Sequence, residues 1–161
     1  MPDTAARGAR VRIVRVQPED FDVGAELAAL TRGRTDVGGV ASFVGVVRDA
    51  NEGAGVGAMT LEHYPGMTEK ELTRISDEAL ARWPLSGTVI VHRVGRLEPG
   101  ARIVLCAAAS SHRQAAFEAC AFVIDFLKTK APFWKREETA SGERWVEARA
   151  GDDAAAARWK S

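Results

Sequence analysis

Two lysines, Lys128 and Lys135, are placed where they could do chemistry together. Lys128 is the last member of a series of residues that recur at helical spacing. Pro132 ends that helix, so the two lysines cannot be helical neighbours. They can still converge from the helix end and from the strand that follows. An amine held in a partly dry pocket is suited to act as an acid, a base or a nucleophile, because desolvation lowers its pKa. The alternative is a lysine whose stem covers apolar surface while its ammonium reaches water. The other members of the apolar stripe that contains Lys128 are Phe117, Ala121 and Ile124.

The segment that joins the two lysines is rich in aromatic rings and positive charge. Phe133 and Trp134 stand beside Arg136, and together they could form a stacking surface for a flat heterocycle with charges for its anionic part. A solvated basic turn with core aromatic side chains is the alternative. The possible pocket-lining residues are Phe43, Pro132, Phe133, Trp134 and Arg136.

A third group of polar residues lies where the same predicted helix begins. His112 and Arg113 follow two serines, and free backbone N–H groups at a helix start suit a phosphate or a carboxylate. An N-cap with exposed polar neighbours explains the same pattern equally well. Arg48 ends an apolar strand at a glycine-rich loop, which could place it at the rim of a pocket.

The elements that must position these residues alternate between strands and helices. Several strand pairs are joined too tightly for parallel crossovers, so we expect an α+β fold with a mostly antiparallel sheet and packed helices. Capping boxes are expected at Thr68–Glu71 and at Ser111–Gln114. Residues 49–57 read as a flexible loop, and residues 1–10 and 150–161 as loosely ordered ends of a single domain, 1–161. The predicted strands are 11–16, 38–47, 58–64, 88–94 and 101–108, with a closing hairpin of 134–138 and 144–147, and the predicted helices are 22–30, about 68–83 and 111–130.

The composition excludes several classes of protein. The 161 residues hold 22 basic and 22 acidic side chains, which argues against a general nucleic-acid or membrane-surface binder. Cys106 and Cys120 match no metal or redox spacing and are expected to be buried thiols in a reducing cytoplasm. No leader and no apolar run long enough for a membrane helix is evident, so a soluble, cytoplasmic protein is expected. His63 and His92 lie in apolar strands and read as core histidines.

With these residues in view, the sequence resembles the family of large subunits of molybdopterin synthase. The matching stretches follow in the same order over about residues 38–149, and departures are concentrated in residues 1–35 and in the 49–57 loop. The stretches are Phe43–Arg48 (FVGVVR), Leu61–Met67 (LEHYPGM), Ser111–Arg113 with Ala116–Glu118, Lys128–Glu137 (KTKAPFWKRE) and Arg144–Arg149 (RWVEAR).

The resemblance implies an α/β-hammerhead-type fold in a homodimer at the centre of a heterotetramer. A small ubiquitin-like sulfur-carrier subunit would bind at each end. Its Gly-Gly C-terminus, activated as a thiocarboxylate, would deliver sulfur to cyclic pyranopterin monophosphate and form the molybdopterin dithiolene. No metal or organic cofactor is expected for this step. By the same resemblance, Lys128 and Lys135 match two catalytic lysines, and the residues that match substrate-binding positions are Arg48, His112, Arg113 and Arg149, the last one entering the neighbouring subunit's site.

Two other functions remain open at this point. A non-catalytic homologue would bind a ubiquitin-like partner without turnover, although it would have no need of both lysines and the arginines. An enzyme of another class that binds a pterin or nucleotide phosphate, such as a hydrolase, would need a metal cluster or a hydrolytic triad that the sequence does not offer.

Overall fold

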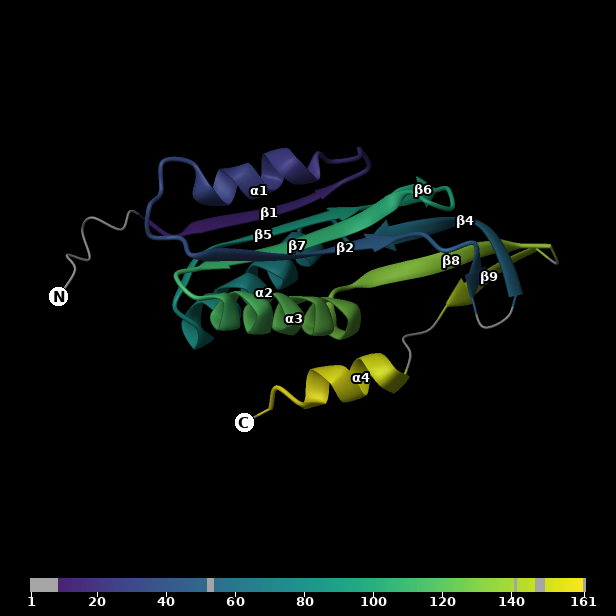
Figure 1. The fold of residues 1–161 in the computed structure, drawn as a ribbon. Helices are drawn as coiled ribbons and strands as arrows, with labels where there is room; N and C mark the ends of the chain where they lie inside the picture. Colours follow the sequence, from purple (N-terminus) through teal and green to yellow (C-terminus); the bar gives the residue numbers. More distant parts are fainter. Residues whose placement is uncertain (1–8, 52–53, 141, 147–149, 161) are drawn as a thin grey trace.

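The computed structural model describes residues 9–51, 54–140, 142–146 and 150–160. Its strands form two sheets that lie side by side, with α1 on one face of the first sheet and α2 and α3 on the other (Figure 1). The strands are β1 (Val11–Gln17), β2 (Gly39–Val46), β3 (Ala50–Asn51), β4 (Ala54–His63), β5 (Leu85–Arg93), β6 (Gly95–Leu97), β7 (Arg102–Ser110), β8 (Phe133–Thr139) and β9 (Gly142–Val146). The helices are α1 (Val23–Thr31), α2 (Met67–Arg82), α3 (Arg113–Lys130) and α4 (Ala150–Ala157).

The first sheet has the strand order β1-β5-β7-β2 and holds most of the core. Only β1 and β5 run parallel, whereas β7 is antiparallel to both of its neighbours. Because both faces are covered by helices, β5 and β7 are buried at nearly every position rather than at alternate ones. The face toward α2 and α3 includes Ile90, Val104 and Cys106, and the face toward α1 includes Val89, Val91 and Leu105.

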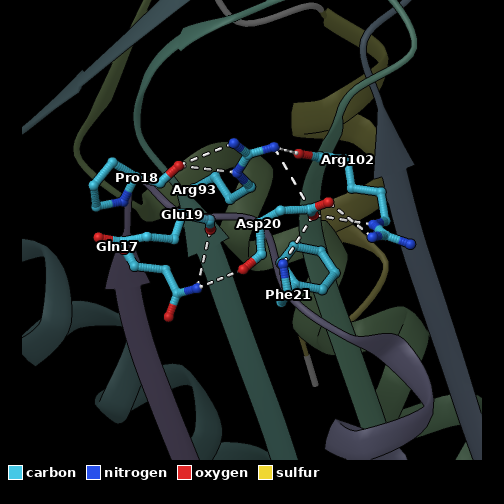
Figure 2. Close-up of polar contacts among 7 residues, drawn as sticks. All are labelled: Gln17, Pro18, Glu19, Asp20, Phe21, Arg93 and Arg102. Carbon is cyan, nitrogen blue, oxygen red and sulfur yellow. Dashed lines mark hydrogen bonds and ion pairs between the residues drawn. The ribbon is translucent and has the colours of Figure 1, made fainter.

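The connection from β1 to α1 is fixed on the first sheet by a polar cluster (Figure 2). The Arg93 guanidinium donates to the carbonyl oxygens of Pro18 and Arg102, at 3.0 to 3.1 Å. Arg102 in turn donates twice to the Asp20 carboxylate, at 2.8 and 3.0 Å. The Arg102 hydrogen bond, the backbone N–H of Phe21 and the nearby Arg93 lower the pKa of Asp20 to about 2.

The second sheet, β3-β4-β8-β9 with β6 beside β4, extends the fold away from the helices (Figure 1). All its pairings are antiparallel, and a small core of Val47, Met59, Leu61 and Leu97 lies where it meets the first sheet. The predicted closing hairpin is confirmed as β8 and β9. The prediction of a loop over 49–57 is wrong for its described part, because β3 and the start of β4 pair there, and residues 52–53 lie outside the described residues.

The helix spans were predicted well, but both predicted capping boxes are wrong. At α2 the Glu69 carboxylate accepts from the Gly66 backbone N–H at 2.6 Å, while the Thr68 hydroxyl accepts from the Tyr64 N–H at 3.1 Å. At α3 the N-cap is His112, whose side chain makes no capping hydrogen bond, and Gln114 donates to Glu118 instead. Spacing alone could not place these caps. The N-cap of α2 is Gly66, two residues before the predicted Thr68, and the N-cap of α3 is His112, one residue after the predicted Ser111, so other residues occupy the capping positions.

The expectation that residues 150–161 are loosely ordered is corrected for 150–160. These residues form α4 and a short extension that packs back on α3. Trp159 contacts the rings of Trp83 and Phe122 edge-on, and its indole N–H donates to the Asp125 carboxylate at 2.7 Å. Of the N-terminal segment 1–10, residues 1–8 lie outside the described residues.

The four helices and two mostly antiparallel sheets of the described residues confirm the expected α+β class. Among the residues that the structure describes, no helix has the length and apolar character needed to cross a membrane.

Candidate active site

The end of α3 and the start of β8 bring Lys128 and Lys135 to the same region of the molecule. α3 ends at Lys130, and its C-cap Ala131 is already extended, with φ −72° and ψ 135°. The Phe133 N–H donates to the Ala131 carbonyl at 2.9 Å, so the chain turns directly from the helix into β8. This geometry confirms that Pro132 separates a helix from a strand.

The sheet face beneath the last turns of α3 forms the floor of this region. Cys106 on β7 pairs with Phe43 on β2, and His92 on β5 pairs with Val104, two residues from Cys106 on β7. The Lys128 ammonium is close enough to act on the pKa of both Cys106 and His92. Burial raises the pKa of the Cys106 thiol well above its usual range, and the nearby Lys128 only partly opposes that shift.

His92 is a buried, neutral imidazole at this floor. Its pKa falls to about 3, first because the ring is buried, and further because Lys128 and His63 are near; its hydrogen bond to the Arg93 backbone opposes the shift. The ring stacks on Phe133, with 3.8 Å between ring centroids and 17° between planes. The interpretation of His92 as a core histidine is therefore correct. The part of the core that contains it is the sheet face beneath the last turns of α3.

The apolar stripe expected to carry Lys128 does not face the sheet. Phe117 is 65% exposed, and Ala121 and Ile124 are only partly buried. The buried face of α3 consists instead of Ala115, Ala116, Ala119, Cys120, Phe122, Val123 and Leu127. Lys128 is thus on the open side of its helix, and its amine approaches the floor from the helix end.

Lys135 is held by a buried carboxylate. The Lys135 ammonium lies 3.3 Å from Glu137, whose side chain is only 2% exposed. The other oxygen of Glu137 accepts from the Arg144 guanidinium at 3.1 and 3.3 Å, because Glu137 and Arg144 face each other across β8 and β9. Glu137 was not predicted from the sequence. The signal that could have found it is its spacing, because Glu137 follows Lys135 by two residues and side chains two apart on a strand share one face.

The stacking surface predicted from Phe133, Trp134 and Arg136 is divided between the two faces of β8. Phe133 shares the face of Lys135, because side chains two apart on a strand point the same way. Trp134 packs edge-on against Tyr64, and Arg136 lies over the ring of Trp145, so both belong to the outer face. Pro132 is half-buried at the link between α3 and β8.

The two ends of α3 separate the predicted anion-binding residues from the lysines. Arg113 is the first residue of α3 and Lys128 lies fifteen residues further on, which is about 22 Å at 1.5 Å per residue. His112 and Arg113 are exposed at the far end, where Gly38 approaches the Ser111 carbonyl so closely that an added Cβ would lie 2.0 Å from it. Arg48, by contrast, follows the buried Val47 at the lysine end. Arg149 lies outside the described residues.

The sequence profile of the family described as "MoaE protein" matches residues 16–130 of the chain. This chain belongs to the MoaE family. The matched region contains Arg48, His112, Arg113 and Lys128, whereas Lys135 lies just beyond it.

Relatives in the MoaE family extend the likeness over nearly the whole chain. The chain is 60% identical over 147 residues to the molybdopterin synthase catalytic subunit of Pseudomonas aeruginosa, covering 91% of this chain and 98% of that protein. Identity to the Escherichia coli protein of the same name is 54% over 151 residues, covering 94% and 99%.

Among solved structures, a molybdopterin biosynthesis MoaE protein from Burkholderia ambifaria superposes with a TM-score of 0.79 at 55% identity, covering 92% and 98% of the two chains. The Staphylococcus aureus molybdopterin synthase superposes with a TM-score of 0.74 at 33% identity, covering 82% and 95%. A Helicobacter pylori chain from a complex of subunits 1 and 2 of molybdopterin-converting factor shares the fold, at 18% identity and a TM-score of 0.67, over 86% and 91%.

Proposed function

We propose that this chain is the catalytic subunit of a molybdopterin synthase. In this role it transfers sulfur from the thiocarboxylated C-terminus of a small ubiquitin-like subunit to cyclic pyranopterin monophosphate, and so forms the molybdopterin dithiolene. The observation that carries the proposal is the 60% identity to a molybdopterin synthase catalytic subunit, in a chain that places Lys128 in the last turn of α3 and Lys135 on β8, on either side of Ala131 and Pro132. Cations suit both reactants, because the precursor carries a cyclic phosphate and the donor tail a negative thiocarboxylate.

The environments of the two lysines support different roles. Lys135 is tied to the buried Glu137, which holds its side chain in place, so it binds an anionic group by charge. Lys128 is exposed on the open side of α3, near enough to the buried, neutral His92 to act on its pKa, and an amine there can exchange a proton or meet the activated tail. Lys128 therefore serves as the acid–base group or transient amine, and Lys135 assists by electrostatics.

A homodimer would unite the residues that one chain keeps apart. Phe117, Ala121 and Ile124 form an apolar stripe along α3 in which Phe117 is exposed and the other two are partly buried, and such a stripe is suited to pack against another helix. The midpoint between Arg113 and Lys128 falls beside Ala121. Two copies packed antiparallel about a two-fold axis at Ala121 would therefore place Arg113 of one copy beside Lys128 of the other. The exposed Phe43 and Val46 on the β2 edge add apolar surface for the same contact.

The small subunit is proposed from the relatives. The Helicobacter pylori structure is described as a complex of two subunits of molybdopterin-converting factor, which supports a small partner for this chain as well. One partner at each end of the homodimer gives the proposed heterotetramer. We also propose that the protein acts in the cytoplasm, where it would encounter this precursor and this sulfur carrier.

Single-turnover sulfur transfer tests this function. The protein is mixed with the thiocarboxylated small subunit and the precursor, and the pterin is analysed by mass spectrometry. Lys128→Ala and Lys128→Arg should both abolish transfer, the second because a guanidinium does not give up its proton at working pH. Lys135→Arg should keep part of the activity, and Lys130→Ala, at the same helix end, serves as the matched control.

The outcomes separate the alternatives. A wild-type protein that binds the small subunit but transfers no sulfur would be a non-catalytic homologue. Release of phosphate from the precursor without sulfur addition would indicate a hydrolase. Full activity of Lys128→Arg would reduce both lysines to binding charges.

A further inference from the structure

Arg144 on β9 is bound to the same buried carboxylate as Lys135. The Oε2 atom of Glu137 accepts from Nε and Nη2 of Arg144 at 3.3 and 3.1 Å, while its Oε1 atom lies 3.3 Å from the Lys135 ammonium. Glu137 is only 2% exposed, so its charge has to be balanced by neighbouring cations rather than by water. One carboxylate therefore holds two cations at defined positions.

The strand register puts this group on the face of the second sheet that meets the first sheet. Glu137 pairs with Met59 of β4 on one side and with Arg144 of β9 on the other. Met59 is 3% exposed and belongs to the small core where the two sheets meet. Phe133, which shares this face of β8, stacks on His92 of the first sheet. Arg144 thus lies on the inner face of the second sheet, which begins at the junction of the two sheets.

The outer face of the same sheet arranges its charges in the opposite way. There one cation, Arg96 of β6, contacts two carboxylates, those of Glu98 and Glu138. On the inner face one carboxylate contacts two cations, Lys135 and Arg144. The described ion pairs therefore gather positive charge on the inner face.

Solvent reaches both cations of the inner face. The side chains of Lys135 and Arg144 are 35 and 40% exposed, although their common partner is buried. A guanidinium has donors on more than one edge of its plane, and an ammonium is a compact charge with three donors. The pair is suited to hold a phosphate or a thiocarboxylate through charge-assisted hydrogen bonds, because Glu137 orders both side chains before the anion arrives.

We propose that Arg144 is a further anion-binding residue of the active site, which acts together with Lys135 while Glu137 holds both side chains in place. The bound group is the anionic end of a reactant, either the thiocarboxylate of the carrier tail or the cyclic phosphate of the precursor. The identity of these reactants rests on the proposed function. Arg144 and Lys135 contact the anion, and Glu137 is a positioning residue.

The anion site can be tested without the reaction. Arginine-labelled protein (13C and 15N) is titrated at constant ionic strength with inorganic phosphate and with thioacetate, which carry the two anionic groups. Arg144→Lys identifies the Arg144 Nε signal in the NMR spectrum. This signal should move along a saturable curve with one of the two anions, whereas the Arg96 signal should not saturate with either.

Sulfur transfer measures the same site with the reactants. Arg144→Gln should raise the half-saturating concentration of one reactant about tenfold, as expected for a lost charge-assisted hydrogen bond. Arg144→Lys keeps a cation for Glu137 and for the anion but loses the planar donors, so its half-saturating concentration should lie between those of Arg144→Gln and wild type. Arg96→Gln is the matched control, which removes one arginine charge from the outer face and should leave both concentrations unchanged. Urea unfolding of each variant shows that the protein is folded under the conditions of the assay.

The results identify the reactant or overturn the inference. Saturation with phosphate and a weaker use of the precursor assign the cyclic phosphate to Arg144, whereas saturation with thioacetate and a weaker use of the small subunit assign the carrier tail. An Arg144 signal that saturates with neither anion, or equal effects of Arg144→Gln and Arg96→Gln, overturns the inference. If wild type transferred no sulfur while the Arg144 signal still saturated, the proposed function would fail and the anion site would stand.

Discussion

Removal of the charge from Glu137 should destabilise the protein far more than the same change one residue later. Glu137→Gln is nearly isosteric, so it leaves no cavity, but it removes the ion contacts to Lys135 at 3.3 Å and to Arg144 at 3.1 Å. A buried pair that loses one partner costs about 3–5 kcal/mol when the other partner is buried too. Here the two cations are 35 and 40% exposed and can turn to water, which reduces the expected loss to about 2–3 kcal/mol.

Glu138→Gln is the matched control for this experiment. The Glu138 side chain is 36% exposed and is paired with Arg96 at the surface, so its loss should cost only a small fraction of the Glu137 effect. Urea unfolding at constant pH gives both values, provided that the slope of free energy against urea stays constant. High salt should reduce the Glu138 effect and leave most of the Glu137 effect. Equal losses in the two variants, or a Glu137 effect that salt abolishes, would refute the reasoning.

Three other perturbations follow from the fold. Trp159→Ala should cost about 3 kcal/mol in urea unfolding, because it removes a large ring from the aromatic contacts that hold α4; an unchanged unfolding midpoint would contradict the packing of α4. Asp20→Asn should destabilise the protein at neutral pH, and the difference from wild type should vanish as the pH falls from 3.8 toward about 2, because the folded-state pKa of Asp20 is lowered; a difference that persists below that range in acid titrations would exclude this origin. Gly38→Ala should cost about 1–3 kcal/mol by forcing a methyl group against the Ser111 carbonyl, whereas Gly39→Ala, with ordinary contacts at 3.6 Å, should cost little in the same assay.

The elements that could be predicted from the sequence are those with a strong local pattern. Strand 11–16, the helix from residue 111 to 130 and the closing hairpin all match the structure closely, because their apolar periodicity or turn residues act over a few neighbours. The change from helix to strand between Lys128 and Lys135 could also be predicted, because Pro132 ends the helix.

The features that could not be predicted depend on distant partners. The stripe through Phe117 and Lys128 is apolar, but the alanines of α3 make an equally good face, and only the packing against the sheet decides between them. The alanine-rich α4 has little amphipathic pattern of its own, and its position depends on Trp159 meeting Trp83 and Phe122. The partition of Phe133 and Trp134 between two faces required the strand to be known, since in a turn both rings could face one side.

The link between α3 and β8 makes the spacing of the two amines an adjustable property of the fold. Lys128 lies on a helix packed on the first sheet, and Lys135 lies on a strand of the second sheet, while only Ala131 and Pro132 separate the helix from the strand. A change of backbone conformation at these two residues would alter the distance between the two amines without replacing either side chain. Under the proposed function, selection for a precursor or carrier tail of different size could therefore act on this two-residue link and leave both lysines unchanged.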